Sequence, residues 1–318
     1  MQYFGLECFE CHKSNTTRKT AHDLGSTISD DHSISNTSTF GAPPEFDIEF
    51  SATHDYGPPL NEIATYMTAV TALEDLCFRD QSSTVPGYPN VPFASPATWY
   101  LPQYNVLIEV TSLQVRYAIW SIQVAAGNAR RVNFWPMIGR FFWRGEFAGR
   151  VDFTNKGRPL PPTGDNVMIG GEQPSATSSL KGSPSAAASR SRLLLNSTAA
   201  VDVFEGARLT IVPTYNGVPL GSRDVFGAAI NAMVLGAEYG LETYCLHLQR
   251  GYVEIIGKND AAGEPMLKYK SVIRAMAMLA SWMARMNRFG EIDAQIRRDD
   301  VVIGTARIKK RGRASASE

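Results

Sequence analysis

The sequence predicts an α+β protein built from two tandem copies of one small module. The chain has 318 residues, 44% apolar and 19% charged, which is more apolar material than one core usually organises. Two stretches of biased composition divide the chain, and the segments between them repeat one order of elements. We expect a disordered tail over 1–44, a first module over 45–160, a low-complexity linker over 161–200, a second module over 201–308 and a basic tail over 309–318.

Composition separates the tails and the linker from the modules. Residues 1–44 are dominated by Ser, Thr, Asn, Asp and His, so they cannot bury enough surface to offset the entropy of ordering. The linker contains Gly170-Gly171 and a run of serine, proline and alanine over 183–189. The cations of 309–318 are typical of a solvated chain end.

Each module begins with a strand, a turn and a helix. The segments 46–50 and 209–212 have strand patterns, and the turns Gly57–Leu60 and Gly217–Leu220 follow them. Apolar residues then recur at helical spacing in both copies: Ile63, Met67 and Val70 in the first, and Phe226, Ile230 and Met233 in the second. Shared turn chemistry and shared periodicity together indicate a duplication.

The remaining elements also correspond. The predicted ranges are hairpins over 98–101 with 106–110 and 245–248 with 253–256, second helices over 113–132 and 265–287, and closing strand pairs over 138–143 with 146–153 and 291–297 with 301–308. The turns Arg144-Gly145 and Asp299-Asp300 suit two-residue hairpins. Gly149 and Gly304 recur within the last strands, which indicates a bulge or a close backbone approach in each copy.

The order β-α-β-β-α-β-β predicts two tandem ferredoxin-like modules, in which the seventh element adds an edge strand by hairpin. Such a module leaves one face of its sheet uncovered, and apolar side chains there need another layer. Phe141, Trp143 and Phe147 lie in the last hairpin of the first copy. We therefore expect the two sheets to pair, or two chains to form a homodimer through their sheet faces.

Charge and hydropathy argue against two classes of partner. Lys and Arg together equal Asp and Glu at 31 each, so nothing in the net charge favours nucleic acid or an anionic membrane. No stretch is long and apolar enough for a membrane span or a secretory signal, which predicts a soluble, cytoplasmic protein. The sequons at Asn15, Asn36 and Asn196 leave secretion open.

The cysteines suggest two kinds of site that their surroundings disfavour. Cys8, Cys11 and His12 form a C-x-x-C-H pattern typical of haem attachment, but they precede a disordered tail with no apolar pocket. The same residues with His22 or His32 are candidate zinc ligands without a second ligand pair at ordinary spacing. We predict no cofactor and no metal. Cys77 and Cys245 lie in apolar patterns and are expected to be buried free thiols; their positions and those of the other cysteines do not indicate a disulfide scaffold.

Catalytic signatures of the common enzyme families are not recognisable in the sequence. The best acid–base candidates are His54 and Asp55, with Tyr56 beside them, in the loop that leaves the first strand. The corresponding loop of the second copy keeps Tyr215 but has neither histidine nor aspartate. We favour a purely structural role for this turn over a site. His247 alternates with leucines in a strand and is expected to point to solvent.

Two clusters have simpler explanations than a ligand site. Aromatic residues over 134–147 alternate with arginines, but the neutral net charge argues against stacking on nucleic acid, so packing or a partner surface is favoured. Methionines recur over 266–286 and predict an adaptable core.

The G-x-P-L turn, the W-Y-L-P strand at 99–102 and Arg288-Phe289-Gly290 resemble segments of lineage-restricted proteins of filamentous fungi. The resemblance implies a class of organism and no activity.

Two functions remain. The first is a non-catalytic binding or scaffolding protein that holds a protein partner or a small apolar ligand in the cleft between the modules or on an aromatic sheet face. The second is a small-molecule enzyme with its site in that cleft near His54, using His54 and Asp55 as acid–base groups and Tyr56 or Tyr215 as donors. The missing catalytic signatures favour the first.

Overall fold

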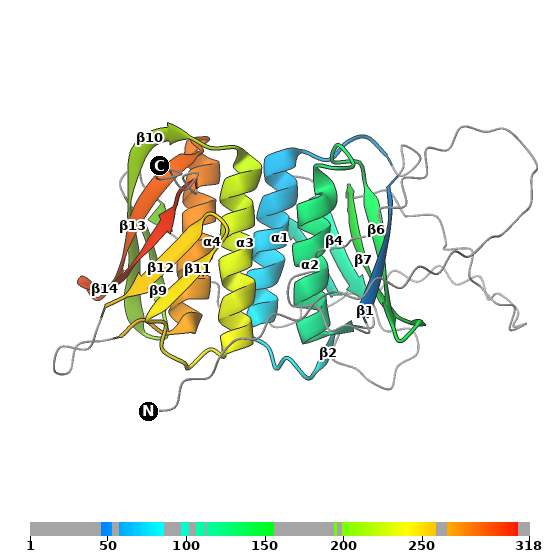
Figure 1. The fold of residues 1–318 in the computed structure, drawn as a ribbon, viewed down its shortest axis with the longest axis horizontal. Helices are drawn as coiled ribbons and strands as arrows, with labels where there is room; N and C mark the ends of the chain where they lie inside the picture. The colour runs from blue at the N-terminus through cyan, green and yellow to red at the C-terminus, as the bar shows by residue number, and fades with distance from the viewer. Residues whose placement is uncertain are drawn as a thin grey trace, which may run out of the picture. The chain divides into compact units, whose positions relative to one another are not determined.

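The computed structural model describes residues 46–52, 57–85, 97–101, 106–111, 113–155, 194–195, 199–258 and 266–310. All of them belong to one compact unit that spans residues 31–318. Within this unit, four helices lie between two antiparallel sheets (Figure 1). The α+β class expected from the sequence is therefore confirmed. The predicted N-terminal tail, most of the predicted linker and the C-terminal tail beyond Lys310 lie outside the described residues.

The first sheet has five strands in the order β1-β6-β7-β4-β3. Its elements, with a separate short pair β2-β5, are β1 (Phe46–Ala52), α1 (Glu62–Cys77), β2 (Thr84–Val85), β3 (Ala97–Leu101), β4 (Val106–Thr111), β5 (Leu113–Gln114), α2 (Val115–Ala129), β6 (Met137–Trp143) and β7 (Glu146–Asn155). The helices α1 and α2 lie on the same face of the sheet (Figure 1). The amide oxygen of Asn61 caps α1 by accepting a hydrogen bond of 2.9 Å from the Ala64 backbone.

The second sheet has seven strands in the order β11-β12-β14-β13-β10-β9-β8. Its elements are β8 (Leu194–Leu195), β9 (Ala200–Phe204), β10 (Ala207–Pro219), α3 (Ser222–Tyr239), β11 (His247–Arg250), β12 (Val253–Gly257), α4 (Tyr269–Met286), β13 (Gly290–Arg298) and β14 (Val301–Ile308). The hairpin β8-β9 was not expected, and β8 lies inside the predicted linker. Asp299 and Asp300 have φ values of +48° and +71°, which fits the predicted two-residue turn between β13 and β14.

Five strands of the second sheet follow the order of the first sheet. The first sheet has the order β1-β6-β7-β4-β3. The second sheet contains the matching order β10-β13-β14-β12-β11, and each strand corresponds to the one at the same place in the first list. The last hairpin of each sheet carries a register shift at matching places, after Phe141 and after Ile296. A β-carbon at Gly149 would lie 2.6 Å from Cγ of Leu113, and one at Gly304 would lie 2.8 Å from Cδ2 of Leu267. The bulge and close approach expected at these glycines are therefore present in both sheets.

The strand order departs from the ferredoxin-like expectation. A split βαβ unit places one strand between the two strands that its helix joins. Here three strands, β6, β7 and β4, separate β1 from β3, which α1 joins. The seventh element, β7, is an interior strand, and the expectation of an edge strand is wrong. The closing hairpin enters between β1 and β4, so β1 becomes the edge.

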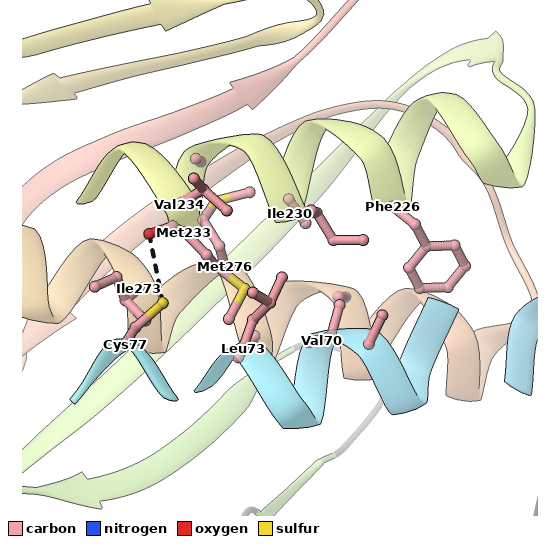
Figure 2. Packing of buried hydrophobic residues seen from close by; sticks show 14 of the residues in the cluster. Val70, Leu73, Cys77, Phe226, Ile230, Met233, Val234, Ile273 and Met276 are labelled. Carbon is pink, nitrogen blue, oxygen red and sulfur yellow. Dashed lines mark hydrogen bonds between the residues drawn. The ribbon is translucent and has the colours of Figure 1, made fainter. Parts of the chain in front are cut away.

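The two helical layers pack against each other, and α1 and α3 meet along their length. Tyr66 of α1 stacks on Phe226 of α3 with ring centroids 5.3 Å apart and planes inclined by 17°. The Ser222 hydroxyl donates to Glu62 near the start of both helices. At the other end, the Cys77 thiol lies 3.8 Å from the carbonyl oxygen of Met233 (Figure 2). Since starts meet starts and ends meet ends, α1 and α3 run parallel.

This α1–α3 seam is apolar between its ends. The residues that fill it are fully or nearly fully buried: Val70, Leu73, Ile230 and Met233, with Ile273 and Met276 of α4 beside them (Figure 2). Every residue of α1 from 64 to 70 is buried. A helix buried on all sides needs a layer on each side. The first sheet supplies one layer for α1, and α3 with α4 supplies the other.

The expected packing of one sheet face on the other within this chain is wrong, because the four described helices lie between the two sheets. Phe141 is fully buried on the helical side of its sheet, against Phe50. Trp143 contacts Tyr117 of α2 at 5.6 Å between centroids. Phe147 alone of the three predicted sheet-face aromatics is largely exposed, at 60%.

Smaller expectations of the sequence are confirmed. Cys77 and Cys245 are free and buried. The methionines at 276, 278 and 283 of α4 belong to the core. The His247 side chain is 55% exposed on β11. The segment Gly217–Leu220, expected as a turn, largely extends β10, which runs to Pro219 and pairs with β13 through a register shift.

Substitution by alanine should have opposite effects on the free energy of unfolding at two glycines of α3. A β-carbon at Gly236 would lie 2.9 Å from Cγ1 of Ile273, so Gly236→Ala should lower the free energy of unfolding by about 1–3 kcal/mol through overpacking. A β-carbon at Gly227 would meet nothing within 4 Å, so Gly227→Ala should raise it by about 0.5–1 kcal/mol through helix propensity. Urea unfolding followed by circular dichroism measures both. Effects of the same sign would contradict the close approach of α3 and α4.

Candidate functional site

An open groove of about 320 Å³ lies between α2 and α3. Gln123, Ala126 and Gly127 line it from α2, and the first three turns of α3 line it from the other side. Tyr66 of α1 also lines it, as does the turn between β11 and β12. The groove therefore combines a helix that packs on the first sheet with a helix that packs on the second, between helices where small-molecule sites commonly form.

Two glycines leave open space between the two helices at this groove. Gly127 and Gly227 both line it, and a β-carbon at either would meet nothing within 4 Å. When α1 and α3, and likewise α2 and α4, are aligned at their first residues, the corresponding positions are Ser281 and Met67. Met67 is a buried core residue, 5% exposed. Between α2 and α3, the backbone at Gly127 and Gly227 is therefore open to the groove. Between α4 and α1, the aligned positions carry the side chains of Ser281 and Met67.

Tyr66 is the unusual residue of the groove. It is 1% exposed, and its hydroxyl has no hydrogen-bond partner. A buried hydroxyl without a partner costs about 1–3 kcal/mol. Burial, together with the carboxylate of Glu62, raises the pKa of this hydroxyl to about 12. At neutral pH Tyr66 is therefore a neutral donor next to the groove, and it needs an acceptor.

No family model, curated protein or solved structure matches this chain. The groove is therefore interpreted from its own geometry. None of the described helices is long and apolar enough to cross a membrane. Within the described residues, no three His, Cys, Asp or Glu side chains are grouped so that they could hold a metal ion.

Four polar side chains complete the lining from the two helices. The Gln123 amide donates a hydrogen bond of 2.6 Å to the Asn231 side-chain oxygen, which joins α2 to α3 across the groove. Gln123 keeps its oxygen as an acceptor, and Asn231 keeps its amide as a donor. Arg223 and Asp224, in the first turn of α3, are half-buried and line the same groove. Neither forms an ion pair with a described residue.

Tyr215 is the one candidate site residue from the sequence that the structure describes, and it does not line this groove. His54, Asp55 and Tyr56 lie outside the described residues, as do Cys8, Cys11 and His12. Tyr215 lies on β10, where its hydroxyl donates to the backbone oxygen of Arg288. The Arg288 guanidinium stacks over the Tyr215 ring at 4.0 Å. Burial raises the pKa of Tyr215 to about 12. Its hydrogen bond and ring contact both connect β10 to the segment after α4, which is a structural role.

Sequence reasoning missed the groove, although a signal for it was present. A glycine inside a predicted helix lowers its stability and calls for a packing or functional reason. Gly127 and Gly227 both stand inside helices, and the positions aligned with them in α4 and α1 are Ser281 and Met67. These differences mark the groove. Tyr66 also differs from the residue aligned with it in α3, which is Phe226 and has no hydroxyl.

Two tyrosines allow a matched test of the unpartnered hydroxyl. Tyr66→Phe should raise the free energy of unfolding by about 1 kcal/mol, because it removes a buried polar group with no hydrogen bond. Tyr215→Phe should lower it by about 0.5–1.5 kcal/mol, because it removes a bond to Arg288. Urea unfolding of both variants measures the difference. Destabilisation by Tyr66→Phe would show that the hydroxyl has a partner in the protein itself.

Proposed function

We propose that this chain is a non-catalytic binding protein, built from two copies of one α+β module, that holds a small molecule in the groove between α2 and α3. The groove is the place where both modules contribute side chains to one concave surface. Its polar groups come from α1, α2 and α3, which the seam fixes relative to one another. A ligand there would be oriented by rigid helices rather than by loops.

Duplication of an ancestral module accounts for the repeated features. The strand order, the bulge in the last hairpin and the glycine approach recur in both sheets. The backbone N–H of Leu60 donates to Phe134, and that of Leu220 donates to Phe289, so the entry to the first helix is held alike in each copy. The seam also brings corresponding residues together, as in a two-fold dimer. The resemblance to fungal proteins remains a proposal about origin.

The unpartnered hydroxyl of Tyr66 is the observation that carries the proposal. Its counterpart Phe226 shows that the same position of the seam works with no hydroxyl at all. The polar atom is therefore not needed for packing, and it lowers stability as long as it makes no hydrogen bond. A ligand acceptor in the groove would satisfy it.

Binding fits this lining better than catalysis. The ionisable residues that line the groove among those described are Tyr66, Arg223, Asp224 and Tyr252. With a pKa of about 12, Tyr66 is a poor base at neutral pH. The alternative enzyme site at His54 uses residues outside the described ranges, and no described residue favours it. The sequence led us to expect a small apolar ligand. We propose instead a ligand with polar groups, because polar side chains line the groove.

Filling the groove with the side chains that the other copy carries should abolish ligand retention. Native mass spectrometry of the wild-type protein, purified from its natural source without denaturant, should show a bound small molecule that denaturation releases. The double variant Gly127→Ser with Gly227→Met should fold, because neither β-carbon meets an atom within 4 Å, and it should lose that mass.

The matched control is Gln249→Met, which adds the same side chain at an exposed position of β11 outside the groove. It should retain the ligand at the wild-type level. Circular dichroism checks that each variant is folded. Retention of the mass by the filled variant, or its loss from Gln249→Met, would overturn the proposal, as would a wild-type protein without any bound molecule.

A further inference from the structure

The charges of the groove define which ligand it suits, if the groove is the binding site proposed above. Arg223 and Asp224 follow each other in the first turn of α3, and both line the groove. They have opposite charges, and neither forms an ion pair with a described residue. Both are half-buried, so a ligand that displaces water from the groove also removes water from them.

Charge complementarity separates four kinds of ligand. An anion would gain from Arg223 but would bring its charge near the Asp224 carboxylate. A cation would gain from Asp224 but would face the Arg223 guanidinium. A neutral molecule would cover both charges without replacing their water, which is costly. A ligand with one positive and one negative group compensates both side chains at once.

The other lining residues fit the remainder of such a molecule. The Tyr66 hydroxyl, the free oxygen of Gln123 and the free amide hydrogens of Asn231 offer one acceptor and several donors. Ala126, Ala228 and Ile230 add apolar surface. The bare backbones of Gly127 and Gly227 let a flat group approach closely. A volume of about 320 Å³ holds a molecule of roughly ten to fifteen heavy atoms.

We propose that the groove binds a small zwitterion of the α-amino acid class with a flat apolar side chain. Its carboxylate pairs with Arg223 and accepts from Tyr66, and its ammonium group donates to Asp224. The side chain lies against the glycines and the apolar residues of α2 and α3. The unpartnered hydroxyl and the two unpaired charges of the groove are then satisfied by one ligand.

Three probes that share a phenyl group test the two charges of the ligand separately. They are L-phenylalanine, 3-phenylpropanoate, which lacks the ammonium group, and 2-phenylethylamine, which lacks the carboxylate. Isothermal titration calorimetry on the full chain at pH 7 should show that L-phenylalanine binds about tenfold or more tightly than either single-charge probe. Equal affinity for the three probes would overturn the proposal.

Two charge-neutralising variants assign the groups. Arg223→Gln should weaken L-phenylalanine and 3-phenylpropanoate by about tenfold and leave 2-phenylethylamine unweakened. Asp224→Asn should weaken L-phenylalanine and 2-phenylethylamine and leave 3-phenylpropanoate unweakened. The matched controls are Arg208→Gln and Asp300→Asn, which remove an exposed ion pair at the hairpin end of the second sheet. They should leave all three affinities unchanged.

Failure of this inference is distinguishable from failure of the proposed function. If none of the three probes binds while the wild-type protein retains a natural ligand that the Gly127→Ser/Gly227→Met variant loses, the amino acid class is wrong and the binding groove stands. If the filled variant still binds L-phenylalanine with wild-type affinity, the amino acid lies elsewhere, and the placement of its carboxylate at Arg223 is wrong. Loss of L-phenylalanine binding in that variant supports the proposal.

Discussion

The packing of α1 against α3 is the interaction on which the rest of the structure depends. Tyr66 stacks on Phe226, and apolar residues continue the contact to the point where Cys77 reaches Met233. Burial raises the pKa of the Cys77 thiol, so this end of the seam is chemically inert at neutral pH. Without α3, one side of α1 would expose apolar surface, because α1 is buried on all sides from residue 64 to residue 70. The seam turns two helical layers into one core that lies between the two sheets.

The groove follows from this seam and from differences between aligned positions of the helices around it. Two helix pairs flank the α1–α3 contact, α2 with α3 on one side and α1 with α4 on the other. One side carries Gly127 and Gly227, and the corresponding positions carry Ser281 and Met67. A hydroxyl is present at Tyr66 and missing at Phe226. The groove lies where these aligned positions differ.

Sequence patterns located most elements but not their arrangement. The closing hairpins were predicted within one or two residues, because Arg144-Gly145 and Asp299-Asp300 fix the turns and alternation fixes the strands. The strand order was missed, because no local pattern says whether a closing hairpin adds at an edge or enters the sheet. The position of the helices could have been predicted: α1 and α3 carry few charges on any side, which is typical of helices between two layers. The groove depends on residues of α2 and α3 that only this packing brings together.

The most direct test of the account is whether the two halves unfold as one unit. Hydrogen exchange in increasing urea, read by mass spectrometry on peptides from α1 and α4, reports each half separately. The account predicts one midpoint for both, and Leu73→Ala, at a fully buried position of the seam, should lower both midpoints equally. Two separate midpoints in the wild-type protein, or a shift confined to the first half in the variant, would contradict it.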